Sequence, residues 1–363
     1  MQTVYSRTST LAAFDSGRPI LGDYPHNSGP IARWMGTIPD STPIELLNIP
    51  GTHDAAAWNY SGPDSAQYLC QGFGFWISAL GTRPDHSKLL FYHSAALLSD
   101  TATLQDVLQG LYYWLDHHRT ETLLLSLKVD NGPTDAALEQ EVYNLIATGP
   151  GRHHWVQTPN EVILGSISLP NVCFLRVRII RTIHIQLGTL GHARGKAILL
   201  RRFSWADLPS PTPSALPGVN LNDGFADNDP DFVIPYNPLR NLSAHVEDYY
   251  AIYGNDTVAQ KVDTKVQAVA AHIQQAVQGV NNTSNFWMTF ASGGGFVGDL
   301  ETIVPKTLAE GDGSTTPGVN AKLSQILNTV HAGKRIRVGA VLLDFYESVG
   351  TLVQDIIGPS HQF

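Results

Sequence analysis

Apolar runs of strand length alternate with amphipathic runs of helix length along most of this chain. The strand-like runs lie at residues 44–49, 89–93, 122–128, 197–202, 286–290 and 336–343. The helix-like runs, in which apolar residues recur at the spacing of one helix face, lie at residues 103–118, 134–147, 257–277 and 319–330. Strands and helices in alternation predict a parallel sheet with crossover helices.

No linker divides this alternating pattern, so we expect one domain over residues 1–363. An irregular (β/α) barrel of the TIM type, in the α/β class, fits the pattern better than two domains do. Thr103 and Asp106 have the spacing of a capping box, which marks the start of the first predicted helix. The proline-rich stretch 209–238 is expected to be a long irregular excursion.

Composition narrows the class of partner. The chain has 363 residues, of which 43% are hydrophobic, and a formal net charge of -9. An acidic protein is not attracted to nucleic acid, so we expect no nucleic-acid partner, although a local basic site for a phosphate group is compatible with this charge. The two cysteines, Cys70 and Cys173, have no metal-ligand spacing.

The amino-terminal residues lack an apolar core of signal-peptide length. No uninterrupted apolar stretch approaches the ~20 residues that span a bilayer. We therefore expect a soluble chain, cytoplasmic as the sequence stands and secreted if a signal precedes this start.

Polar residues stand at the carboxyl ends of the predicted strands or one turn beyond, where a β/α barrel builds its active site. They are two histidines, two cations and a carboxylate: His53, His93, Lys128, Arg202 and Asp344. Each residue taken alone is more often a solvated strand end. Together they are suited to phosphoryl transfer, because one imidazole can take a proton, the other can give one, and cations can neutralise phosphate charge.

The segments that carry these residues resemble a known family. Residues 49–54 (IPGTHD), 91–94 (FYHS) and 121–128 (ETLLLSLK) look like the X-domain motifs of phosphatidylinositol-specific phospholipases C, in the same order and spacing. Later segments resemble that family's single-domain, bacterial-type branch; they are 195–203 (GKAILLRRF), 248–250 (DYY) and 338–344 (VGAVLLD). The similarity runs from about residue 45 to 345 and looks closest to the fungal phospholipase-C-like phosphodiesterases.

The resemblance implies a phosphoric diester hydrolase that acts through paired histidines. His53 would be the general base that deprotonates the inositol 2-hydroxyl, which attacks phosphorus within the same molecule and forms a cyclic phosphate. His93 would be the general acid for the leaving oxygen, with Asp54 assisting on that side. Asp344 would hydrogen-bond His53, fix its tautomer and stabilise the imidazolium.

The resemblance also implies a set of substrate-binding residues. Lys128, Arg202 and Asp248 would bind the inositol hydroxyls, and Tyr250 would offer a ring face to the sugar. Lysine and arginine only donate hydrogen bonds and aspartate only accepts them, which suits a polyol. The implied substrate is a phosphoinositide-like lipid or a soluble phosphodiester, with a peripheral membrane contact in the lipid case.

One strand departs from the family pattern. The family carries Gly-x-Arg-x-x-Asp-x-Arg shortly before the second histidine, whereas an ungapped count places residues 72–79 there, with Ile77 for the acid and Ala79 for the arginine. Loss of a preorganised charge at phosphorus costs on the order of 3 to 4 kcal/mol. The alternative function is therefore a catalytically impaired homologue that binds a phosphorylated head group or a protein partner.

The same positions bear on cofactors. The calcium-dependent branch uses an amide after the first histidine and acids on the altered strand, where this chain has Asp54 and Ile77. Calcium is accordingly not supported, and we expect no metal or other cofactor.

Other segments offer competing interpretations. Residues 293–298 (GGGFVG) match a dinucleotide fingerprint, which would favour an oxidoreductase, but Pro305 breaks the following segment, so an active-site loop fits better. The adjacent histidines at 117–118 and 153–154 favour solvated side chains over metal ligands. Residues 162–186 interrupt the family pattern as an atypical insertion, either a diverged exposed loop or a gene-model error.

Overall fold

The computed structural model describes residues 30–55, 75–82, 89–93, 96–98, 103–131, 136–157, 187–208, 217–279, 282, 284–334 and 336–361. The insertion at 162–186 lies outside these ranges. Eight of the described strands form one continuous parallel series, in the order β7-β6-β5-β2-β1-β14-β11-β9. Their bounds are β1 (Ile49–Thr52), β2 (Phe75–Thr82), β5 (Leu123–Asn131), β6 (Ala197–Arg202), β7 (Val219–Asn220), β9 (Leu242–Asp248), β11 (Asn285–Ala291) and β14 (Ala340–Leu343).

This order is the sequential winding of a (β/α) barrel, because each strand neighbours the next parallel strand along the chain. The winding is open between β7 and β9, where no pairing joins β7 to β8 within the described ranges. Instead β8 (Asp229–Asn237) pairs antiparallel with β9. The chain therefore has an irregular barrel, as the sequence predicts.

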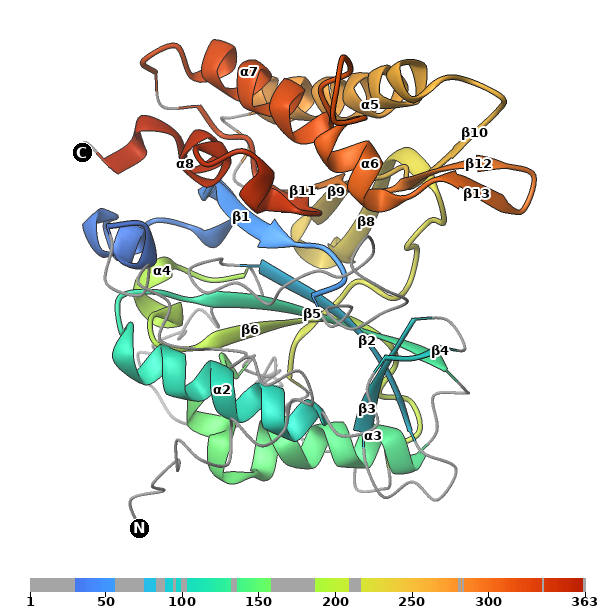
Figure 1. The fold of residues 1–363 in the computed structure, drawn as a ribbon. Coiled ribbons are helices and arrows are strands. Elements are labelled where there is room, and N and C mark those ends of the chain that lie inside the picture. Colours follow the sequence, from blue (N-terminus) through green and yellow to red (C-terminus); the bar gives the residue numbers. More distant parts are fainter. Residues whose placement is uncertain are drawn as a thin grey trace, which may run out of the picture.

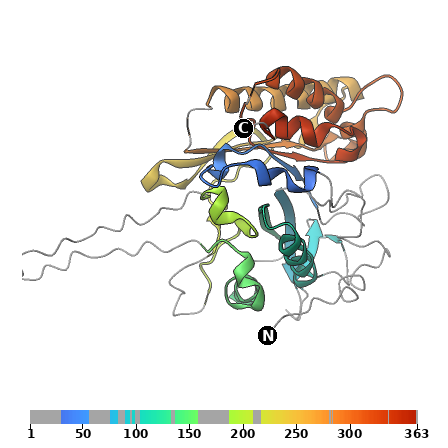
Figure 2. The same cartoon turned by 90° about the vertical axis from the view of Figure 1, so that its left-hand side faces the viewer.

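Helices cover the outside of the strands in two groups, one on each side (Figures 1 and 2). The bounds of the α-helices are α2 (Leu104–His117), α3 (Ala136–Tyr143), α4 (Leu190–Ala193), α5 (Val258–Gln278), α6 (Pro305–Glu310), α7 (Val319–His331) and α8 (Leu352–Ile357). The shorter helical turns are η2 (Pro30–Thr37), η3 (Ile44–Leu46), η4 (Asn144–Thr148), η5 (Pro150–His154), η6 (Pro238–Arg240), η7 (Tyr346–Ser348) and η8 (Gly358–His361). Within the described residues, no helix is long and apolar enough to cross a membrane.

Short strands extend the barrel rim. A hairpin of β3 (Leu89–His93) and β4 (Ala96–Leu97) pairs antiparallel with β2. A separate three-stranded sheet consists of β10 (Ala251–Tyr253), β12 (Gly294–Val297) and β13 (Leu300–Ile303). Figure 1 shows this small sheet beyond the ends of β9 and β11.

The first predicted strand is wrong in its bounds. Residues 44–46 form a 3₁₀ turn, and β1 runs through Pro50 and Gly51, beyond residue 49 where the predicted run ends. The amide of Ile49 donates to the Gly339 carbonyl just before β14, and that of His53 donates to the Leu343 carbonyl at its end. Pro50 therefore faces the β2 side, where pairing begins only at Gly51. A proline at an unpaired strand position loses no ladder hydrogen bond.

The proline-rich stretch was also misjudged, because it contains β7 and the nine-residue β8. Pro230 and Pro235 lie in β8, which is an edge strand with mostly solvated side chains, the setting in which proline is tolerated. The last predicted strand is shorter than expected, since β14 begins only after Gly339, whose φ is +80°. The four predicted helices and the capping box at Thr103 are confirmed.

Candidate active site

The candidate residues are brought together by the alternation of side chains along the barrel strands. Alternate apolar residues enter one central cluster, with members on five strands at Ile49, Leu124, Leu200, Val246 and Leu342. The same alternation, continued by two or four residues toward the carboxyl ends, reaches the polar candidates His53, Lys128, Arg202, Asp248 and Asp344. The polar site therefore lies directly above the apolar core, at one end of the barrel.

His53 is held between a carboxylate and an aromatic ring. Its Nδ1 lies 3.1 Å from Oδ1 of Asp344, whose side chain is 1% exposed. Its ring stands edge-on to Phe290, with centroids 5.9 Å apart. Because a carboxylate only accepts hydrogen bonds, Asp344 fixes the tautomer with the proton on Nδ1 and leaves Nε2 as the acceptor.

Asp54 stands between the two histidines. Its Oδ1 is 3.6 Å from Nε2 of His53 and its Oδ2 is 3.5 Å from Nε2 of His93. The residue has a φ of +40°, a backbone conformation that a residue with a side chain adopts at some cost and that is found preferentially at functional sites. The strained backbone places one carboxylate beside both imidazoles.

The charges around His53 strongly favour its protonated form. Burial lowers its pKa, but the carboxylates of Asp54 and Asp344, followed by the charge of Asp248, outweigh burial and raise the pKa to about 9. His53 is therefore protonated at Nε2 through neutral pH, and it acts as a base from the fraction that has lost this proton, which grows as the pH approaches 9.

Arg202 ends β6 and Asp248 ends β9, and β7 and the opening in the barrel lie between these two strands. The guanidinium carbon of Arg202 lies 3.5 Å from the centroid of the Phe225 ring, a cation–π contact that holds its side chain. Asp248 is 7% exposed, and burial raises its pKa, against the lowering effect of His53 and Arg202. These two residues offer a hydrogen-bond donor and a hydrogen-bond acceptor whose charges interact.

Tyr250 follows Asp248 by two residues. Its hydroxyl donates to Oδ1 of Asp227 at 2.8 Å, and burial together with that carboxylate raises its pKa to about 12. The pattern that marked Tyr250 gave no indication of Asp227. Sequence reasoning missed three residues that contact the site: Phe225 at Arg202, Asp227 at Tyr250 and Phe290 at His53. Only the folded structure reveals these contacts.

The altered strand lies where it was expected. β2 contains Ile77 and Ala79, and Ala79 pairs with Lys128 while Ile77 pairs with Ser126. Lys128 in turn pairs with Arg202 on β6. The position at which the family carries an arginine therefore neighbours the two cations of the site.

Three expectations need correction. His93 ends β3, an antiparallel strand paired with β2, so a hairpin and not a barrel strand brings it to Asp54. Residues 294–297 form β12 and not a loop, and the antiparallel strand β13 follows them where a dinucleotide site requires the start of a helix. Of the paired histidines, His118 and His154 are buried against the protein instead of being solvated.

Those buried histidines have structural partners. His118 Nδ1 contacts the Trp114 carbonyl at 2.9 Å, and His154 Nε2 contacts Asp116 Oδ1 at 3.1 Å. Among the described side chains, no group of three or more histidine, cysteine, aspartate or glutamate residues is arranged to hold a metal ion.

Comparisons with known proteins agree on one fold. No protein-family model matches the chain. A 1-phosphatidylinositol phosphodiesterase of Listeria monocytogenes is 29% identical over 119 residues, which are 30% of this chain and 37% of that relative's length. The aligned segment is thus well under half of the relative.

Solved structures align over almost the whole chain. The phosphatidylinositol-specific phospholipase C from Listeria monocytogenes superimposes with a TM-score of 0.61 at 19% identity, covering 92% of this chain and 99% of that one. A variant of the corresponding Staphylococcus aureus enzyme gives a TM-score of 0.63 at 19% identity, covering 90% of this chain and 96% of that one. The protein therefore has the irregular TIM-barrel fold of the bacterial phosphatidylinositol-specific phospholipases C.

Proposed function

We propose that the protein is a phosphoric diester hydrolase that cleaves phosphatidylinositol, glycerophosphoinositol or a related phosphodiester in the manner of a phospholipase C. One observation carries the proposal: His53, backed by Asp344, is joined through Asp54 to His93 at one end of a barrel with the phospholipase C fold. One catalytic domain, with its motifs between residues 45 and 345, suffices for this function.

The reaction proceeds through an intramolecular attack. His53 Nε2 takes the proton of the inositol 2-hydroxyl as that oxygen forms a bond to phosphorus. The bond between phosphorus and the leaving oxygen breaks, and His93, assisted by Asp54, gives that oxygen a proton. The products are a cyclic inositol phosphate and an alcohol, and Asp344 stabilises the imidazolium formed on His53.

The remaining polar residues bind the head group. Lys128 and Arg202 donate to inositol hydroxyls, Asp248 accepts from them, and Tyr250 presents its ring to the sugar. The two cations also stabilise negative charge that develops on the phosphate oxygens.

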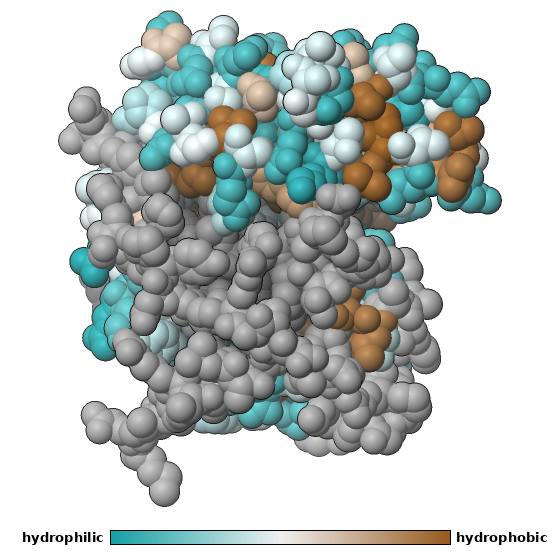
Figure 3. All heavy atoms as spheres, in the orientation of Figure 1, coloured by the Kyte–Doolittle hydropathy of each residue, from teal (hydrophilic) through white to brown (hydrophobic). Residues whose placement is uncertain are grey.

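A lipid substrate would require contact with a membrane surface. Large apolar side chains are exposed around the small sheet, at Tyr253, Val297, Leu300 and Val304. Figure 3 shows apolar surface at the upper right, where this sheet lies in Figure 1. This sheet follows directly from the Asp248–Tyr250 region, so a bilayer touching it would lie next to the site, and we propose a peripheral contact there.

The test is turnover of phosphatidylinositol in mixed vesicles and of glycerophosphoinositol in solution. We expect wild-type turnover, its loss in His53→Ala and in His93→Ala, and wild-type rates in His117→Ala, a control at an exposed histidine on α2. Equal residual rates in wild type and His53→Ala would refute the proposal.

A second function is favoured by one observation, the position of Ala79 beside Lys128. Without an arginine there, the protein could bind a phosphorylated head group without cleaving it. Saturable binding of inositol phosphate by wild-type protein, lost in Arg202→Ala and accompanied by no turnover, would support this function over hydrolysis.

A further inference from the structure

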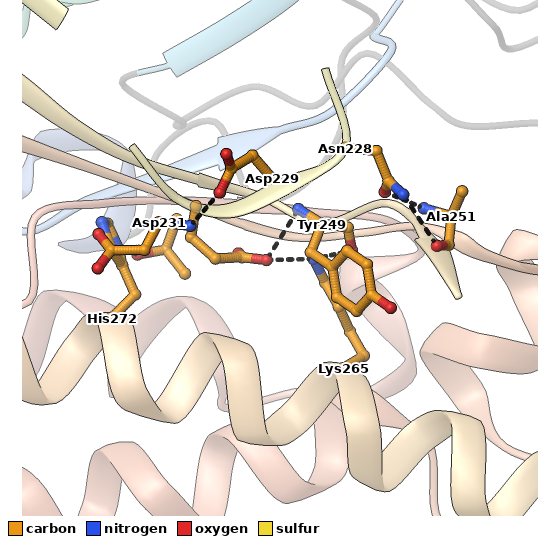
Figure 4. A network of polar contacts seen from close by, with 9 residues as sticks. Asn228, Asp229, Asp231, Tyr249, Ala251, Lys265 and His272 are labelled. Atoms are coloured by element: carbon orange, nitrogen blue, oxygen red, sulfur yellow. Dashed lines mark hydrogen bonds and ion pairs between the residues drawn. The ribbon is translucent and has the colours of Figure 1, made fainter. Parts of the chain in front are cut away.

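A buried ion pair lies behind the end of β9, on the side away from the proposed head-group site. Lys265 of α5 places its Nζ 2.7 Å from Glu247 Oε1, and both side chains are 0% exposed. The same ammonium donates to the Tyr249 carbonyl at 2.7 Å, and Glu247 Oε1 accepts the Tyr249 amide at 3.1 Å. Figure 4 shows Lys265 reaching from the helix to this backbone.

The pair belongs to a wider set of bonds that holds the backbone after Asp248. Each of four consecutive carbonyls, from Tyr249 to Ile252, accepts a hydrogen bond from a different donor. The donors, in order, are Lys265 Nζ, the Gly294 amide, Asn228 Nδ2 and Lys261 Nζ. Residues 249–252 are thus anchored by α5, by β12 and by the turn before β8.

Glycine is required where β12 approaches this segment. A Cβ at Gly293, whose φ is +147°, would lie 2.4 Å from the Tyr250 carbonyl oxygen. Gly293 therefore serves close packing against Tyr250, and a Cβ at Gly294 or Gly295 would meet Glu301 or Lys261. Close packing explains the motif that sequence reasoning weighed as a nucleotide site.

The ion pair is placed to control Asp248. Along β9 the side chains alternate, so Glu247 faces α5 while Asp248 faces the barrel interior. A fully buried ion pair adds little stability over an apolar pair of similar size, because desolvation offsets the attraction. Its two bonds to Tyr249 instead fix the backbone immediately after Asp248.

We propose that Lys265 and Glu247 are positioning residues that set Asp248 and Tyr250 for recognition of the head group of the phosphodiester. The inference rests on the proposed function, and it places two residues that determine head-group binding outside the pocket. Glu247 and Lys265 touch no substrate; they act through the backbone that carries Asp248.

The test compares two variants of α5 in the full chain. Lys265→Met/Glu247→Gln removes both charges together and leaves no unpaired ion. Lys261→Met is the matched control, because Lys261 is also buried and lies one turn earlier, but it makes no bond to Tyr249. Its bonds go to the Ile252 and Phe296 carbonyls, and Ile252 is four residues beyond Asp248. The assay is hydrolysis of glycerophosphoinositol. In the double variant we expect KM to rise about tenfold or more and kcat to change by less than about threefold. In Lys261→Met we expect KM and kcat to stay near their wild-type values.

A second readout does not depend on turnover. The charge of Asp248 contributes to the high pKa of His53, so displacement of Asp248 should lower that pKa, as followed by NMR titration of the histidine rings. We expect the lowering in the double variant and not in Lys261→Met. A double variant with wild-type KM and wild-type His53 titration would overturn the inference, as would equal changes in both variants. If wild-type protein hydrolyses no phosphodiester, the proposed function fails, and the His53 titration alone decides the positioning role.

Discussion

Asp344→Asn should show whether catalysis requires His53 to be held in one orientation and tautomer, because this variant keeps His53 and removes only the group that holds it. The substitution keeps the shape of the side chain but removes a charge that is 1% exposed and 3.1 Å from Nδ1. An amide nitrogen facing Nδ1 would favour the opposite tautomer, with the proton on Nε2. The imidazole would then be unable to take the proton of the attacking hydroxyl.

The magnitude follows from the charges around His53. Its pKa rises from 6.5 to about 9 even though burial, the largest single influence, lowers it. That rise corresponds to about 3.4 kcal/mol of net stabilisation of the imidazolium, and Asp54, Asp344 and Asp248 share it. Removal of Asp344 should lower the pKa by about one unit or more, and the wrong tautomer should reduce kcat by roughly 10³- to 10⁴-fold.

The assay is kcat against pH for glycerophosphoinositol, together with NMR titration of His53. Asp54→Asn is the matched control, because it also removes a carboxylate beside His53 but on the Nε2 side. A phosphodiester with an acidic leaving group, which needs little protonation, should restore much of the rate of Asp54→Asn and little of the rate of Asp344→Asn. If Asp344→Asn retained wild-type kcat while its His53 pKa fell, the assigned role of Asp344 would be refuted.

Three further outcomes can be measured. Ala79→Arg should raise kcat/KM by up to a few hundredfold, because it returns a cation beside Lys128; an unchanged rate would show that phosphate charge is neutralised elsewhere. Phe225→Leu removes the ring under Arg202 and should raise KM about threefold to thirtyfold in the same assay, whereas an unchanged KM would contradict that role. Burial lowers the pKa of His272 to about 4, so the unfolded chain binds more protons than the folded chain between about pH 4 and 6.5. The free energy of unfolding therefore falls as the pH is lowered from 6.5 to 4, by up to about 3 kcal/mol. Urea unfolding should show a smaller loss in His272→Gln, and an equal loss would contradict this origin.

The sequence predicted those parts of the fold that depend on local pattern. Apolar runs located β5, β6 and β11, and the Thr103 capping box located the start of α2, because these signals lie within one element. β9 was missed although residues 242–248 alternate apolar and polar side chains, and that alternation would have placed Asp248 at a strand end.

The parts that failed depend on distant partners. Pro50 is tolerated inside β1 because the pairing of β1 with β2 begins only at Gly51. No local pattern in the sequence reveals where that pairing begins. His93 reaches the site on a hairpin, and Asp54 bridges both histidines through a left-handed backbone. Candidate residues could be predicted one by one from strand ends and family resemblance, whereas the contact between them is a property of the folded chain.

The central claim is that His53 activates a hydroxyl of the substrate itself. The most direct measurement is phosphorus NMR of phosphatidylinositol during turnover by wild type and by His53→Ala. The account predicts a cyclic inositol phosphate as the first product in wild type and none in His53→Ala. Inositol monophosphate as the first product, or the cyclic phosphate at equal rates in both proteins, would contradict it.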